Sequence, residues 1–194
     1  MTSRFIHLSV HTEYALIDSL IRIKSLIKHT KAMDMPAIAV TDHCNLFAMV
    51  KFYRQAMAQG IKPIVGSDVW IRHEKDIAHP YRLTLLCKNL EGYRNLAQLL
   101  TKAYLQGQHN GIAMLEKDWI EEHSTGLIAL SGGMEGDIGQ ALVNDDHKRA
   151  LKYCQQWQRL FPDSFYIELV RVGKPGEETY VRSAVKLAIK THLP

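Results

Sequence analysis

Two short motifs carry residue types that could do chemistry, and each follows an apolar run. HLSVHTEYALID occupies residues 7–18, and TDHCNLF occupies residues 41–47. Imidazole and carboxylate groups that converge from separate strand ends can bind a divalent cation, which can activate water or hold a phosphate oxygen. Each histidine taken alone is also compatible with a hydrogen-bonded residue at a strand end. Together the motifs indicate a candidate metal site, and both interpretations stay open.

The segments that must position these motifs alternate between strand-like and helix-like patterns. Apolar, β-rich runs begin at Phe5, Ala37, Lys62, Tyr81, Gly126 and Ser164. Apolar residues three and four positions apart predict helices over residues 20–33, 46–59, 93–104, 147–161 and 177–192. This alternation predicts parallel βαβ units. Sites in such α/β folds form where the strands end, an edge that here presents His11, Asp42, His43, Asp68, Arg82 and Ser131.

Length and composition limit the possible classes of protein. With 194 residues, of which 46% are hydrophobic, we expect one domain over residues 1–194 with one core. No apolar run approaches the roughly 20 residues of a membrane span, and the start lacks a signal peptide, so we expect a cytoplasmic protein without a membrane partner. The 3 cysteines form no CxxC pair, which favours reduced thiols. The net charge of +4 is spread along the chain, without the basic run of a dedicated nucleic-acid groove.

Several sequence blocks resemble a known family when taken in order. HLSVHTEYALID, AIAVTDHCNLFAMVKFY, GIKPIVGSDVWI, LTLLCKNLEGYRNLAQLLTKAY, GLIALSGG and FYIELVRVGKPGEETY are similar to the N-terminal PHP (polymerase and histidinol phosphatase) domain of the DNA polymerase III alpha subunit. The resemblance implies an α/β fold, a distorted (β/α)7 TIM-like barrel of the PHP type. Residues 1–194 would lack the last βα unit and would belong to a longer polymerase chain.

The resemblance also assigns site residues position by position. His11, Asp18 and His43 match family metal ligands, and Asp68 stands where a glutamate is usual. The resemblance implies that three matched positions have lost a ligand. Ser9 and Arg82 each stand where the family has a histidine, and Gly133 stands where it has a cysteine. A site without several ligands should hold its ion poorly, so we expect no tightly bound cofactor and at most weak zinc or manganese.

Arg82 suggests what replaces the metal. Its guanidinium would repel a divalent ion, and we expect it to serve as the counter-charge to Asp18 and Asp68, which preserves the loop geometry without the chemistry. The alternative is a mononuclear site formed by His11, Asp18, His43 and Asp68.

The leading functional hypothesis is therefore a scaffold with a degenerate phosphoesterase site. The resemblance implies that the parent chain is a DNA-directed DNA polymerase, a nucleotidyltransferase of DNA replication that contacts DNA. It further implies that this domain packs on the rest of the alpha chain and, in members with degenerate sites, helps hold the proofreading exonuclease subunit. We expect residues 1–194 by themselves to have no polymerase and little or no phosphoesterase activity. The rivals are an active metal-dependent phosphoesterase (a pyrophosphatase or a proofreading 3'-5' exonuclease) and a DNA-binding module.

Overall fold

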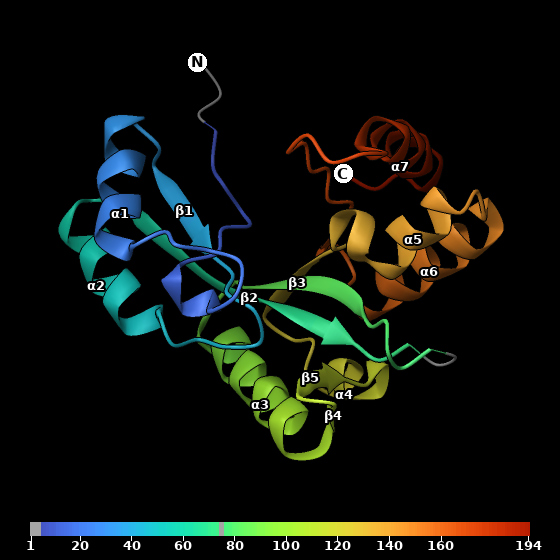
Figure 1. The fold of residues 1–194 in the computed structure, drawn as a ribbon, viewed down its shortest axis with the longest axis horizontal. Helices are drawn as coiled ribbons and strands as arrows, with labels where there is room; N and C mark the ends of the chain where they lie inside the picture. The colour runs from blue at the N-terminus through green and yellow to red at the C-terminus, as the bar shows by residue number, and fades with distance from the viewer. Residues whose placement is uncertain (1–4, 74–75) are drawn as a thin grey trace. The chain divides into compact units, whose positions relative to one another are not determined.

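The computed structural model describes residues 5–73 and 76–194 (Figure 1). The chain divides into two units between Asp68 and Val69. Unit 1 covers residues 1–68 and unit 2 covers residues 69–194. Strand β2 (Lys62–Ile71) runs through the boundary, so its first part belongs to unit 1 and its end to unit 2.

Unit 1 is an α/β arrangement of two helices and a parallel strand pair. After the short 3-10 helix η1 (Glu13–Ala15) come α1 (Ile23–Ala32), β1 (Ala37–Val40) and α2 (Met49–Ala58). Strand β1 pairs in parallel with the first part of β2, with Ala37 opposite Lys62 and Val40 opposite Val65. A helix connects the two strands, as a parallel crossover requires. The predicted β1, β2, α1 and α2 are confirmed.

The core of unit 1 forms because apolar residues recur on one face of each helix. Its buried members are Ile23, Ile27, Ile38, Val40, Ala48, Phe52, Ala56 and Ile61. All four residues of β1 are buried, as expected for a strand that elements cover on both faces.

The strand predicted from Phe5 is wrong, because residues 5–11 form no regular strand. The segment contacts β1 through two backbone hydrogen bonds, from Ala39 N to His7 O (2.9 Å) and from Thr41 N to Val10 O (2.9 Å). Evenly spaced bonds are the rule in a parallel ladder, and here the Val10 N–H donates instead to the Thr41 hydroxyl at 3.2 Å. A side chain has therefore replaced a backbone acceptor.

Unit 2 contains a mixed set of strands. The end of β2 pairs in parallel with β5 (Ile112–Leu115), which also pairs antiparallel with β4 (Gln108–His109). Strand β3 (Tyr81–Cys87) is antiparallel to β6 (Leu127–Leu130), and β6 is parallel to β7 (Phe165–Tyr166).

The helices of unit 2 fall into two groups. Helix α3 (Leu90–Gln106) contacts β3, β5 and β6, and α4 (Lys117–Glu122) follows β5. Helices α5 (Asp137–Val143), α6 (His147–Leu160) and α7 (Glu177–Thr191) pack against one another (Figure 1). The short 3-10 helix η2 (Gly133–Glu135) precedes α5. The predicted α3, α6 and α7 are confirmed.

Three expectations for unit 2 were incomplete or wrong. The pattern missed β4, β5, α4 and α5, which are all short. The predicted all-parallel arrangement is wrong, because β3 is antiparallel to β6. The segment between Ile71 and Tyr81 is also too short for the helical crossover that a parallel β2–β3 connection needs. The strand predicted from Ser164 shrinks to β7, because the Glu168 N–H donates to the Ser131 hydroxyl at 2.9 Å and not to a neighbouring strand.

Phe52 and Phe47 offer a matched test of the core of unit 1. Phe52 is 1% exposed and Phe47 is 65% exposed. We predict that Phe52→Ala lowers the free energy of unfolding by about 3–5 kcal/mol, because a buried ring leaves a cavity, and that Phe47→Ala changes it little. Urea unfolding of both variants measures the two values, and similar losses would contradict this description of the core.

Candidate metal centre

His11, Asp18 and His43 meet in unit 1. One ligand atom from each lies within 4.8 Å of the others. The Asp18 carboxylate joins the two rings, because its Oδ2 is 2.7 Å from His11 Nδ1 and 3.0 Å from His43 Nε2. The ring centroids of His11 and His43 are 4.4 Å apart. The structure therefore brings together three of the four residues predicted as metal ligands.

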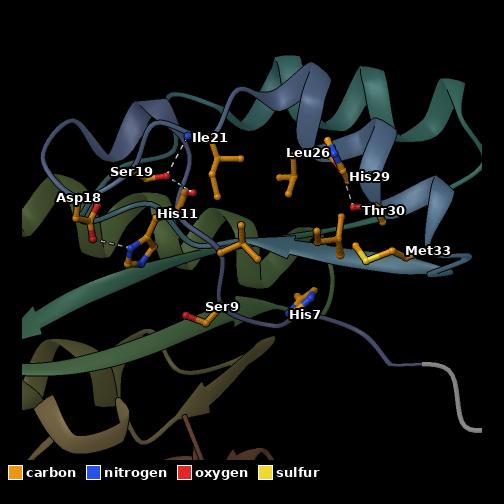
Figure 2. A pocket seen from close by; sticks show the side chains of 12 residues that line it. His7, Ser9, His11, Asp18, Ser19, Ile21, Leu26, His29, Thr30 and Met33 are labelled. Carbon is orange, nitrogen blue, oxygen red and sulfur yellow. Dashed lines mark hydrogen bonds and ion pairs between the residues drawn. The ribbon is translucent and has the colours of Figure 1, made fainter. Parts of the chain in front are cut away.

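Local turns after residue 11 return Asp18 to His11. The Thr12 side chain caps η1 by accepting from Tyr14 N at 3.2 Å. The chain turns back at Leu16, whose φ is 70°. The Ser19 hydroxyl then donates to the His11 carbonyl at 2.7 Å and closes the loop (Figure 2).

Asp68, the fourth predicted ligand, lies on the other side of the His11 ring. His11 Nε2 is 2.8 Å from Asp68 Oδ2, and the Asp68 side chain is fully buried. An ionised carboxylate only accepts hydrogen bonds, so two carboxylates on the two ring nitrogens favour the imidazolium form of His11.

The pKa directions agree with this arrangement. Burial alone would lower the pKa of His11, but the hydrogen bond and charge of Asp68, together with Asp18, outweigh it and raise this pKa. Burial would raise the pKa of Asp18, but the two histidines outweigh it and lower this pKa. Both carboxylates therefore stabilise the charged form of His11.

Asp42, predicted to line the site, is held behind it. Its side chain is buried, and it accepts from both Thr12 N (2.6 Å) and the Thr12 hydroxyl (2.8 Å). Burial raises the pKa of Asp42, an effect that the two hydrogen bonds from Thr12 partly oppose.

Ser9 lines an open cavity of about 410 Å³ beside the histidine cluster. The cavity also contacts His11 and Asp18, and Figure 2 shows it between α1 and the segment that contains Ser9. Other lining residues such as Leu26 and Met33 are apolar. The hydroxyl of Ser9 is a poorer metal donor than the imidazole that the sequence resemblance implies at this position.

Arg82 and Gly133 lie together in unit 2. The sequence analysis predicted Arg82 at the end of a strand, but Arg82 lies near the start of β3. Because β3 and β6 are antiparallel, the start of β3 lies beside the end of β6. Its Nε donates to Gly132 O at 3.2 Å, and its Nη2 is 3.3 Å from Glu168 Oε2. Glu135 is a longer partner at 3.7 Å from Nε.

Gly133 leaves little room for the cysteine that the sequence resemblance implies at this position. Its φ is +59°, in the left-handed region that favours glycine, and a Cβ there would lie 3.3 Å from Arg82 Nη2. Ion pairs of Arg82 with Asp18 and Asp68 would connect residues of the two units. These pairs remain a prediction.

The donor set fits one ion better than a cluster. Two imidazoles and a carboxylate supply the three protein ligands that an open zinc site uses, and Asp68 could then orient His11 through its second ring nitrogen. Such an ion would supply Lewis acidity and a bound water. Ligation by His11 would require one ring nitrogen to exchange a carboxylate for the metal. Among the residues that the structure describes, this is the single group with such spacing.

Sequence reasoning missed four supporting residues. They are the hydroxyl-bearing Thr12, Ser19 and Ser67 and the acidic Glu168. Glu168 could have been found as a lone acid inside an apolar run. The hydroxyl residues carry no comparable signal.

We predict a pH-dependent contribution of His11 in the metal-free protein. Its pKa is raised above the ordinary value of 6.5, so its stabilising contribution is full below that value and is lost as the pH rises through the folded-state value. The difference in free energy of unfolding between wild type and His11→Gln should therefore shrink from about pH 6 to about pH 9. Urea unfolding with a chelator present checks this, with His29→Gln on α1 as control. A constant difference across this range contradicts it.

We also predict that Arg82 stabilises unit 2. The side chains of Arg82 and Glu168 are 12% and 8% exposed. Arg82→Ala should lower the free energy of unfolding by roughly 3 kcal/mol, because it removes one member of a largely buried ion pair. Lys102→Ala, which removes a pair with the exposed Glu122 carboxylate, should cost much less. Urea unfolding compares them, and equal losses would refute the prediction.

The matching family model and similar curated proteins indicate the same family. The family model of the PHP domain matches residues 7–172. DNA polymerase III subunit alpha of Pseudomonas aeruginosa is 42% identical over 194 residues, which are 100% of this chain and 16% of that protein. The Escherichia coli K12 subunit is 40% identical over 194 residues, with 98% of this chain and 16% of that protein covered. The chain thus spans a small part of the curated relatives that it matches.

Two solved structures share the fold. A protein from Bifidobacterium adolescentis assigned to the metal-dependent phosphoesterases matches with a TM-score of 0.60 at 10% identity, over 97% of this chain and 83% of that one. An amidohydrolase from Chromobacterium violaceum matches with a TM-score of 0.61 at 13% identity, over 97% and 84% of the two chains. The predicted α/β class is confirmed, and the strand and helix order fits a partial TIM-like barrel of the PHP type. The chain belongs to the PHP domain family, and its sequence is similar to the PHP region of DNA polymerase III alpha subunits.

Proposed function

We propose that this chain acts as the PHP scaffold domain of a replicative DNA polymerase III alpha subunit, with a degenerate phosphoesterase site. The observation that carries the proposal is His11, which lies between the carboxylates of Asp18 and Asp68. A charged imidazolium there offsets part of the negative charge of two carboxylates that would otherwise attract a cation. Ser9 and Gly133 remove further donors.

The scaffold role follows from what such a domain can still do. It keeps a folded α/β unit whose buried charges are paired, and it has lost the donors for a metal cluster. We propose that it packs on the rest of the alpha chain and helps hold the proofreading exonuclease subunit, while DNA is bound through the parent polymerase. The similarity to polymerase III alpha subunits supports this assignment.

No helix among the described residues is long and apolar enough to cross a membrane. We propose a cytoplasmic location, because a replicative polymerase acts on chromosomal DNA in the cytoplasm.

The second candidate is a mononuclear phosphoesterase. The spacing of His11, Asp18 and His43 favours it, since these residues could hold a weakly bound zinc or manganese. The chain's own contribution would be to orient the ligands, with Asp68 fixing the His11 ring.

Metal analysis with an activity assay separates the two candidates. We predict substoichiometric zinc and manganese in the purified protein, because His11 is already paired with carboxylates, and no manganese- or zinc-dependent hydrolysis of bis(p-nitrophenyl) phosphate above background. His43→Ala should leave both measurements unchanged. Stoichiometric metal, with turnover that His43→Ala abolishes, would establish the phosphoesterase instead.

Two binding measurements test the partners. A scaffold should bind the purified proofreading exonuclease subunit and should show no steep salt-dependent affinity for primed DNA. Steep loss of DNA affinity with salt would support the DNA-binding alternative.

A further inference from the structure

His11 lies on a segment that has no regular strand pairing to place it. Residues 5–11 are irregular, yet the His11 ring lies 4.4 Å from the ring of His43. We propose that Asp42, through Thr12, is the positioning residue that holds these two histidines side by side. Asp42 would do so whether or not an ion is bound.

The contact between Asp42 and Thr12 fixes the backbone that follows His11. Asp42 Oδ1 accepts from Thr12 N at 2.6 Å, and Asp42 Oδ2 accepts from the Thr12 hydroxyl at 2.8 Å. Thr12 is 0% exposed and Asp42 is 1% exposed, so water does not compete for these bonds. Two bonds to one carboxylate set the orientation of residue 12 as well as its position.

A second pair of bonds fixes the backbone that precedes His11. Thr41 N donates to Val10 O at 2.9 Å, and Val10 N donates to the Thr41 hydroxyl at 3.2 Å. The residues on both sides of His11 are therefore bound to the two residues that precede His43. These four hydrogen bonds fix the backbone on both sides of His11 relative to the residues before His43, beside the contact that the Asp18 carboxylate makes with both rings.

Asp42 also connects this pair of segments to the third one. The Ser67 hydroxyl donates to the Asp42 carbonyl at 2.7 Å, and Cys44 N donates to Asp68 O at 2.8 Å. Asp68 is the residue on the far side of the His11 ring. Asp42 therefore lies where the three chain segments of the candidate centre meet.

A purely structural role would affect stability without moving the site. Thr30 provides the comparison, because it is also 0% exposed in unit 1, but its hydroxyl donates to Leu26 O within α1, at 2.9 Å. Thr12→Val and Thr30→Val each remove a threonine hydroxyl, and the two positions are equally buried. Both should lose some stability, and only Thr12→Val should alter the histidine pair.

The decisive measurement is the nuclear Overhauser effect between the His11 and His43 ring protons in the chelator-treated protein. It should be present in wild type and Thr30→Val and lost or strongly weakened in Thr12→Val. Thr12→Ser, which keeps the hydroxyl, should restore it. Asp42→Ala should remove it, and Asp42→Asn, whose amide can bond both Thr12 groups, should retain it. If Asp42→Ala fails to fold, the threonine variants still decide.

A zinc titration supplies a second readout. If wild type binds zinc, Thr12→Val should weaken the affinity at least about tenfold and Thr30→Val should leave it unchanged. If wild type binds no zinc, the mononuclear candidate fails and the ring-proton measurement alone decides the role of Asp42. An unchanged effect between the rings in Thr12→Val would overturn the inference.

Discussion

A charge removed from water must find a partner inside the protein, and this constraint shapes the region around the histidines. His11 is placed between Asp18 and Asp68, and Asp42 accepts two hydrogen bonds from Thr12. Leaving the buried carboxylates of Asp68 and Asp42 unpaired would be costly, because burial penalises an isolated charge far more than a hydrogen-bonded one. His11, Asp18, Asp68 and Asp42 therefore each have a partner within the protein.

The same constraint operates in unit 2. Arg82 pairs with Glu168 near the meeting point of β3 and β6. Asp137, which is 4% exposed, accepts from the indole of Trp157 and from Lys117. Each buried charge therefore ties together elements that are far apart in sequence. Buried ion pairs of this kind can keep the loops of unit 2 in place.

Hydrogen bonds from short side chains replace part of the regular sheet in unit 1. The segment before His11 forms no ladder; there the Thr41 hydroxyl accepts from Val10 N and the Thr12 hydroxyl donates to Asp42. Such bonds are short-ranged and directional, so they define the position of a histidine closely. The candidate centre thus depends on residues that bear no metal-binding chemistry of their own.

The sequence by itself determined the α/β class, the family and most of the long elements, because periodic apolar residues and a colinear set of motifs depend on local order along the chain. It also singled out His11, Asp18 and His43, which the structure brings together. Only the tertiary structure decided that β3 is antiparallel to β6, that the segment before His11 is irregular, and that His11 is paired on both nitrogens. These features arise from contacts between residues distant in sequence, and the hydroxyl and carboxylate partners that make them leave no periodic trace in the chain.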